Sequence, residues 1–134
     1  MTELFNSSHI EYLKKIKFEK RLKQLEKKLK NKKIAIYGAG AFFQDLCKCY
    51  NLQNLNIVVV SDRSFNEKGT FMGFVSCPIS EITSFSPDYI LVGTINFVQI
   101  IEDLEQQFDK SIKIRPLIKK PFIDLWKEIW NSNY

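Results

Sequence analysis

Apolar residues near the start of the chain recur at intervals that predict one amphipathic helix over residues 10–30. The stretch contains no Gly or Pro, and most of its polar positions are lysines. Its apolar residues are separated mainly by three and four positions, as on one face of a helix; they are Leu13, Ile16, Phe18, Leu22, Leu25 and Leu29. We expect this face to pack against the rest of the domain or against a sister subunit, with the lysines in solvent.

The rest of the chain alternates short apolar runs with helical patterns. The runs predict strands at residues 33–37, 56–61, 89–93 and 112–116, and a shorter one at 74–77. Helical spacing begins near Ala41 and recurs over residues 95–108 and 122–130, with a brief helix at 79–83 and a loop at 63–74. Strands separated by helices indicate right-handed crossovers and a parallel sheet.

The predicted fold class is therefore α/β: a Rossmann-like parallel sheet with flanking helices, preceded by the basic amphipathic helix. A chain of 134 residues is near the common size for one domain with a single core. We divide it into the N-terminal helix, residues 1–31, and the Rossmann-like domain, residues 32–134.

Two glycines follow the first predicted strand and begin a helix, as in a dinucleotide-binding turn. Gly38 and Gly40 take the first two glycine positions of that pattern, but Phe43 takes the third. Backbone N–H groups from Ala39 to Ala41 would face a phosphate. Asp62 ends the second strand, where a carboxylate accepts hydrogen bonds from ribose hydroxyls. The alternative is a tight structural turn, with Asp62 capping a loop.

Further candidate ligand residues follow the second and third predicted strands. Arg63 could meet a 2′-phosphate or a second sugar, or simply lie in solvent. Gly93, Thr94 and Asn96 follow the strand at 89–93, at the edge where open α/β sheets bind ligands. The alternative role for Thr94 or Asn96 is the N-cap of the next helix.

The sequence offers no evident catalytic base. Its one histidine, His9, precedes the basic helix and is predicted to be a surface residue. No Tyr-x-x-x-Lys pair follows the third strand, so the short-chain dehydrogenase mechanism has no visible residues. Cys47, Cys49 and Cys77 indicate neither a disulfide framework nor a metal site, and Cys77 is expected to be an inert buried thiol.

Charge is concentrated at one end of the chain. The net charge is +5, and residues 14–33 hold ten Lys and one Arg against two Glu. Nucleic acid or an anionic membrane is a weak expectation, since Arg and aromatic residues are not interleaved with the lysines. The 4-3-4 spacing from Phe18 to Leu29 allows a short dimer seam or a partner enzyme at this helix. No apolar run is long enough for a membrane span and no secretory signal is present, so we expect a cytoplasmic protein.

Three runs resemble the Rossmann-like modules of bacterial sugar-nucleotide and surface-polysaccharide enzymes: KKIAIYGAGAFFQDL, VVVSDRSFNEKGTFMGFVSCPISEI and PDYILVGT. Such modules form the N-terminal part of sialic-acid-type acetyltransferases and the C-terminal part of sugar C-methyltransferases. The matching positions are Gly38, Gly40, Asp62, Gly69, Gly73, Pro78, Pro87 and Asp88. The resemblance covers about residues 32–115 and implies a nucleotide, nucleotide-sugar or NAD(P) ligand, although Phe43 departs from it. Neither a hexapeptide repeat nor a methyltransferase half is in the sequence.

Three functions fit these observations. The first is a nucleotide or nucleotide-sugar binding module of bacterial glycan metabolism, with Gly38, Ala39 and Gly40 around phosphate and Asp62 on ribose. The second is a small NAD(P)-dependent oxidoreductase or transferase subunit, completed by dimerisation through the N-terminal helix. The third is an interaction domain that has lost its ligand, for which Phe43 is the indication. Fold alone does not choose among them.

Overall fold

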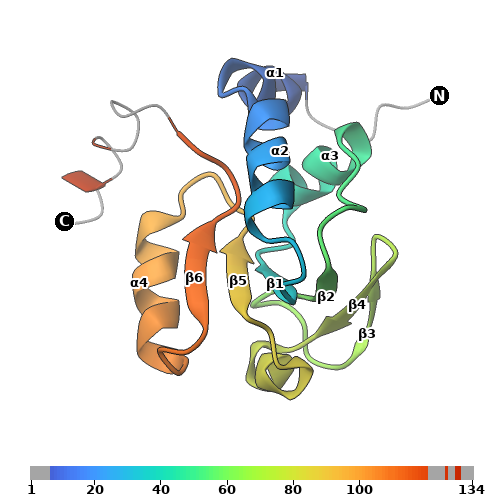
Figure 1. Ribbon diagram of the computed structural model, residues 1–134, viewed down its shortest axis with the longest axis vertical. Helices are drawn as coiled ribbons and strands as arrows, with labels where there is room; N and C mark the ends of the chain where they lie inside the picture. The colour runs from blue at the N-terminus through green and yellow to red at the C-terminus, as the bar shows by residue number, and fades with distance from the viewer. Residues whose placement is uncertain (1–6, 121–125, 127–128, 131–134) are drawn as a thin grey trace.

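Six short strands form one sheet in the order β3-β4-β2-β1-β5-β6 (Figure 1). The computed structural model describes residues 7–120, 126, 129 and 130. The strands are β1 (Ile34–Tyr37), β2 (Ile57–Ser61), β3 (Gly69–Phe71), β4 (Phe74–Cys77), β5 (Tyr89–Val92) and β6 (Lys113–Pro116). The helices are α1 (Ser7–Lys15), α2 (Phe18–Lys28), α3 (Ala41–Cys49), α4 (Val98–Gln107) and the 3-10 helix η1 (Ile79–Phe85). All pairings are parallel except that of β3 with β4.

The first strand of the chain, β1, lies in the middle of the sheet, and later strands are added on both sides of it. From β1 the chain proceeds to β2 and β4 on one side, then returns to β5 and β6 on the other. Right-handed crossovers in opposite directions place α3 and α4 on opposite faces of the sheet. In Figure 1, α1, α2 and α3 gather together, whereas α4 stands beside β6. The Rossmann-like α/β fold is thus confirmed, and the strand order reverses between β1 and β5.

The N-terminal amphipathic segment is two helices, so the prediction of one continuous helix was wrong. α1 ends at Lys15 and α2 begins at Phe18, with Lys17 between them at φ 57° and ψ 52°. Ile16 and Phe18 are both buried, at 8% and 0% exposure. Two residues apart on one helix they would point about 200° away from each other. The left-handed residue between them turns both side chains inward.

Both N-terminal helices share the hydrophobic core of the sheet. Their buried residues belong to the same cluster as the strands; they are Leu13, Ile16, Phe18, Leu22, Leu25 and, just beyond α2, Leu29. Arg21 adds a polar connection, because its guanidinium donates to the backbone oxygens of Pro116 (2.7 Å) and Leu117 (3.1 Å). The carboxyl end of β6 is therefore bonded directly to α2.

The stretch predicted as a loop at 63–74 contains an additional strand. β3 pairs antiparallel with β4 through a two-residue turn, and both turn residues have positive φ, Met72 at 53° and Gly73 at 84°. Such turns match the twist of a hairpin. The prediction missed β3 because that strand is only three residues long and two of them, Gly69 and Thr70, are not apolar strand-forming residues.

Other element boundaries differ by a few residues from their predicted positions. The helix predicted at 95–108 begins three residues later, at Val98, and the brief helix at 79–83 is a 3-10 helix that continues to Phe85. The closing helix predicted at 122–130 falls mostly outside the described residues.

Candidate functional site

The glycine turn after β1 lies at the point where the strand order reverses. Gly38 has φ 106°, which L side chains rarely adopt, and its N–H donates to the backbone oxygen of Ser61 at 2.9 Å. A Cβ on Gly38 would lie 2.8 Å from Cγ2 of Thr94, just after β5. The ends of β1 and β5 therefore lie so close together that a side chain at position 38 would collide with Thr94.

Asp62 holds this turn from the end of β2. Its Oδ1 accepts the backbone N–H of Ala39 at 2.7 Å, and its Oδ2 accepts the N–H and the hydroxyl of Ser64 at 3.0 and 2.6 Å. These bonds give Asp62 the loop-capping role that was the alternative to ligand binding. A carboxylate oxygen has two lone pairs, so Oδ1 retains the capacity to accept one more hydrogen bond.

The ionisation of Asp62 is tied to the same contacts. Burial by itself raises the pKa of its carboxyl, but the hydrogen bonds from Ala39 and Ser64, with the charge of Arg63, outweigh burial and hold that pKa below its ordinary value. Because the folded-state pKa is the lower one, ionised Asp62 stabilises the fold above its unfolded-state pKa of about 4. That stabilisation is lost as pH falls through the folded-state pKa.

We expect Asp62→Asn to be less stable than the wild type at pH 7 and to lose less further stability on acidification. The asparagine oxygen can still accept the Ala39 N–H, whereas its amide nitrogen cannot accept from Ser64. Urea denaturation at a series of pH values from about 7 to about 2 gives the free energy of unfolding of both proteins. Parallel pH profiles would contradict the proposed coupling between this carboxylate and the turn.

Phe43, the departure from the glycine pattern, lies in the core. Its side chain is fully buried, and a Cβ on Gly93 would come within 3.1 Å of both Phe43 Cδ1 and the Gly38 backbone oxygen. Gly93 thus makes room for the ring beneath the end of β5. At Gly40, by contrast, an added Cβ would meet nothing within 4 Å. The outer side of the turn, at the uncapped start of α3, is open.

A cleft of about 540 Å³ lies at the carboxyl ends of β1 and β2, bounded by α4 and the start of η1. Its polar lining comes from Tyr37, Asp62, Arg63, Thr94, Asp103 and Gln107, and its apolar lining from Ile79, Ile100 and Leu104. We call this space, which Gly38 also lines, the carboxyl-edge cleft. In open α/β sheets ligands bind at this edge, next to the strand-order reversal.

The sequence-predicted site residues divide between this cleft and its surroundings. Gly38, Asp62, Arg63 and Thr94 line it. The remaining predicted residues do not, and these are Ala39, Gly40, Ala41, Gly93 and Asn96. The alternative role of Thr94 or Asn96 as a helix N-cap was wrong, because α4 has Phe97 at its N-cap position without a side-chain cap. The Thr94 hydroxyl instead donates to the Asn96 backbone oxygen at 3.3 Å.

Several cleft residues were missed by sequence reasoning. Tyr37 is the last residue of β1, and α4 contributes four side chains, which are Ile100, Asp103, Leu104 and Gln107. These four recur at the i, i+3, i+4 and i+7 positions that share one face of a helix. The spacing was present in the sequence, but its mixture of polar and apolar residues did not distinguish a ligand-facing surface from an ordinary solvated one.

The carboxyl-edge cleft is equipped for hydrogen bonding. Burial and the charge of Asp62 raise the pKa of the Tyr37 phenol, although Arg63 opposes them, so Tyr37 is a neutral donor at pH 7. Ionised Asp62 is an acceptor, and Asp103 offers another carboxylate on the opposite wall. No histidine lines the cleft.

His9 proved to be more than a surface residue. Its Nδ1 lies 2.5 Å from Oδ2 of Asp45, a residue of α3 that is only 2% exposed. The imidazole also meets the ring of Phe42 edge-on, with centroids 5.4 Å apart. The pair joins α1 to α3 and is not part of the cleft lining.

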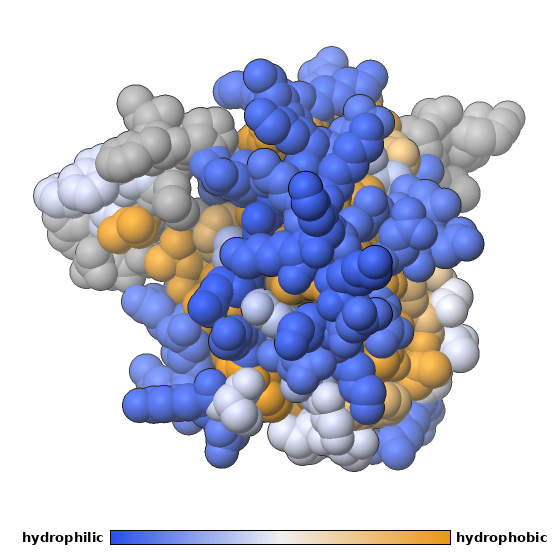
Figure 2. Space-filling model, in the orientation of Figure 1, coloured by the Kyte–Doolittle hydropathy of each residue, from blue (hydrophilic) through white to orange (hydrophobic). Residues whose placement is uncertain are grey.

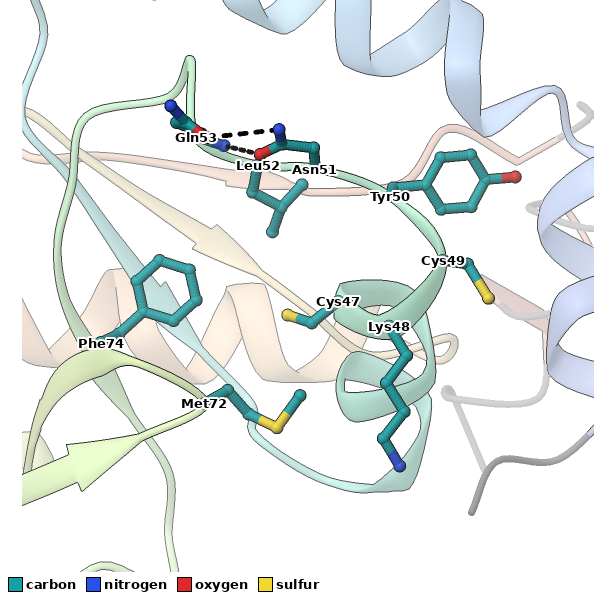
Figure 3. Close-up of a pocket in the computed structure, with 9 residues that line it drawn as sticks. All are labelled: Cys47, Lys48, Cys49, Tyr50, Asn51, Leu52, Gln53, Met72 and Phe74. Atoms are coloured by element: carbon teal, nitrogen blue, oxygen red, sulfur yellow. Dashed lines mark hydrogen bonds between the residues drawn. The ribbon is translucent and has the colours of Figure 1, made fainter. Parts of the chain in front are cut away.

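A second hollow, of about 670 Å³, lies at the end of α3 beside the β3–β4 turn (Figure 3). Within its lining, the backbone N–H of Gln53 donates to the side-chain oxygen of Asn51 at 2.8 Å. Burial raises the pKa of the Cys47 thiol to about 12, which keeps it protonated. Lys48 is the one charged residue of this lining. The carboxyl-edge cleft, with both carboxylates and a guanidinium, is chemically the richer site.

Neither a metal cluster nor a membrane span was found in the described part of the chain. Within it, no three His, Cys, Asp or Glu side chains come together as a metal site would require, and no helix is long and apolar enough to cross a bilayer. The three cysteines are free, with Cys77 buried, Cys47 half-buried and Cys49 exposed.

Comparison with known proteins places the chain in a protein family. The family model described as the C-methyltransferase C-terminal domain matches residues 7–113. That range includes α1, α2 and every residue that lines the carboxyl-edge cleft. The match confirms the resemblance to the C-terminal part of C-methyltransferases and does not extend to the acetyltransferases. No curated protein and no solved structure matches the chain.

Proposed function

We propose that this chain, which belongs to the family of C-methyltransferase C-terminal domains, binds a nucleotide sugar in its carboxyl-edge cleft. In this role it is the substrate-binding domain for the C-methylation of a sugar. The observation that carries the proposal is the cleft itself, which combines hydroxyl-binding groups with an apolar wall at the sheet edge where such folds take ligands.

The charged groups of the cleft suit the hydroxyls of a sugar or a ribose. Asp62 and Asp103 offer two carboxylates against the one guanidinium of Arg63, so hydroxyls rather than phosphates would make most of the polar contacts. Carboxylates accept hydrogen bonds from hydroxyls, and the phenol of Tyr37 donates one. Arg63 is exposed and lies beside Asp62, where a guanidinium can form a bidentate pair with a phosphate at the cleft mouth.

The apolar wall suits the rest of such a ligand. Ile79 from η1 meets Ile100 and Leu104 from α4, and these side chains offer aliphatic contact to the C–H face of a sugar ring or to a nucleobase. The lining supplies no histidine or cysteine, and Tyr37 stays protonated at neutral pH. We therefore assign substrate binding, and not methyl transfer, to this domain.

Ligand titration of a cleft variant tests the proposal. We expect UDP-, GDP-, CMP- or dTDP-sugars to raise the melting temperature, since a ligand at a hundredfold excess over Kd adds about 2.7 kcal/mol of stability. Asp103→Asn should weaken binding by about tenfold or more, because it removes one hydrogen bond between the ligand and a charged group. The matched control is Glu102→Gln, the adjacent exposed carboxylate of α4, which does not line the cleft and should bind as the wild type does.

Two results would contradict the proposal. Equal binding by Asp103→Asn and Glu102→Gln would place the ligand elsewhere. Stabilisation by S-adenosylmethionine or NADH but by none of the nucleotide sugars would assign the cleft to a different ligand class. Because Asp103 is exposed and its carboxylate accepts a surface hydrogen bond from Gln99 (3.0 Å), either variant should fold normally.

A further inference from the structure

Positive charge on α1 and α2 is not balanced by nearby acidic groups. Residues 14–33 have nine more basic than acidic side chains, which exceeds the net charge of +5 of the whole chain. Figure 2 shows the hydrophilic surface that these residues form over α2. The ion pairs found among the described residues are His9 with Asp45 and Lys68 with Glu81, and neither includes a lysine of these helices.

The break between α1 and α2 gathers part of this charge around one concave space. A hollow of about 740 Å³ is lined by Ile10, Lys14, Lys17, Phe18, Glu19, Lys20, Cys49 and Tyr50, and we call it the lysine hollow. Lys14 comes from the last turn of α1, Lys20 from the first turn of α2, and Lys17 from the left-handed position between them. A continuous helix over this stretch would have no such concave junction. Among the described residues of the lining, Glu19 is the single acidic one, so these residues together have a charge of +2.

The hollow also contains the amino end of α2. The N–H groups of Lys20 and Arg21 donate to the Lys17 backbone oxygen, and α2 has no side-chain cap. The N–H groups of Phe18 and Glu19 precede these first intrahelical bonds, and the helix dipole adds positive potential at this end. Lysines are unfavourable at a helix amino end, because they repel the dipole. Lys17 and Lys20 stand at this end of α2 and Lys14 faces the same hollow, so a bound anion would relieve the repulsion among these charges.

Tyr50 supplies the rigid side of the hollow. Its ring packs edge-on against Phe18, with centroids 5.0 Å apart, and Phe18 is fully buried. Tyr50 itself is half-buried, so part of the ring faces the hollow. Lysine ammonium groups act on phosphate as point charges and need no single planar geometry. The volume of the hollow is within the range of small-molecule sites.

From these observations we propose that the lysine hollow binds the diphosphate group of a small soluble ligand, with Lys14, Lys17 and Lys20 around it and the N–H groups of Phe18 and Glu19 facing it. This site shares no residue with the carboxyl-edge cleft. A test of this site is therefore independent of the test of the proposed function.

Titration with inorganic pyrophosphate tests this site directly. We expect isothermal titration to show binding to the wild type and a loss of about tenfold or more in the triple variant Lys14→Gln/Lys17→Gln/Lys20→Gln. The matched control, Lys27→Gln/Lys28→Gln/Lys30→Gln, removes the same charge beyond the hollow, around the carboxyl end of α2, and should bind as the wild type does. Asp103→Asn should leave pyrophosphate affinity unchanged, which separates this test from that of the cleft. In ¹⁵N-labelled protein the amide signals of Phe18 and Glu19 should shift on titration.

The two triple variants should also differ in stability without any ligand. At low salt the hollow variant should melt at a higher temperature than the wild type, because the repulsion among three lysines is removed and two of them, Lys17 and Lys20, stand at the positive end of α2. The control variant should melt lower, because its lysines favour the negative end. Equal pyrophosphate affinity in both triple variants, or melting shifts of the same sign, would overturn the proposal. Binding to phosphatidylglycerol vesicles with none to pyrophosphate would also overturn it, since the lysines would then serve a lipid surface.

Discussion

Gly38→Ala is expected to lower the free energy of unfolding by about 3 kcal/mol, combining backbone strain with overpacking. Gly38 has φ 106°, and the new Cβ would lie 2.8 Å from Cγ2 of Thr94. Thr94 is β-branched, so its methyl group has little freedom to rotate away. Urea denaturation of the two proteins measures the difference, and the melting temperature should fall by about 8 °C or more for a domain of this size.

Two further variants separate the causes of that loss. Gly40→Ala lies two residues away in the same turn, at φ −76° with no atom near its Cβ, and should cost about 1 kcal/mol or less. Thr94→Ser removes the methyl group that the new Cβ would meet, so it should restore part of the stability of Gly38→Ala and leave only the strain. If Gly38→Ala is as stable as Gly40→Ala, the close contact between the ends of β1 and β5 is not present in solution.

The loss of the single histidine is the second large expected effect. His9→Ala should reduce the free energy of unfolding by about 3 kcal/mol, because it removes a hydrogen bond to the buried carboxylate of Asp45. Asp45 is 2% exposed and lies 2.5 Å from the His9 ring nitrogen. The variant also loses the edge contact of the imidazole with Phe42. Urea denaturation at pH 7 measures the effect.

A double-mutant cycle isolates the pair itself. His9→Ala, Asp45→Ala and the double variant should give a coupling free energy of about 2 kcal/mol. The two side chains are in contact, so either single substitution already removes their interaction. Glu11→Ala is the control for α1, because Glu11 is exposed on the same helix, and it should change stability by less than about 0.5 kcal/mol. Additive effects of His9→Ala and Asp45→Ala would show that the contact does not hold α1 on α3.

The candidate site was only partly accessible from the sequence. The glycines and Asp62 could be found because strand ends and turn residues leave a local signature of fixed spacing. Asp62 lies just after β2, but its hydrogen bonds to Ala39 and Ser64 could not be read from spacing. Asp103 and Gln107 reach the cleft only because α4 packs beside the ends of β1 and β2, some forty residues or more away along the chain. Nothing local to α4 marks that face as a lining.

The sequence by itself determined the α/β class, the positions of the parallel strands and the glycine turn, because hydrophobic periodicity and turn chemistry act over a few neighbouring residues. Only the tertiary structure decided where the helix breaks, because the turn at Lys17 is favourable only when both Ile16 and Phe18 have a core to enter. Packing likewise placed Phe43 beneath Gly93 and paired His9 with buried Asp45. Those contacts join residues that are distant in sequence, so their energies appear only when the whole chain is folded.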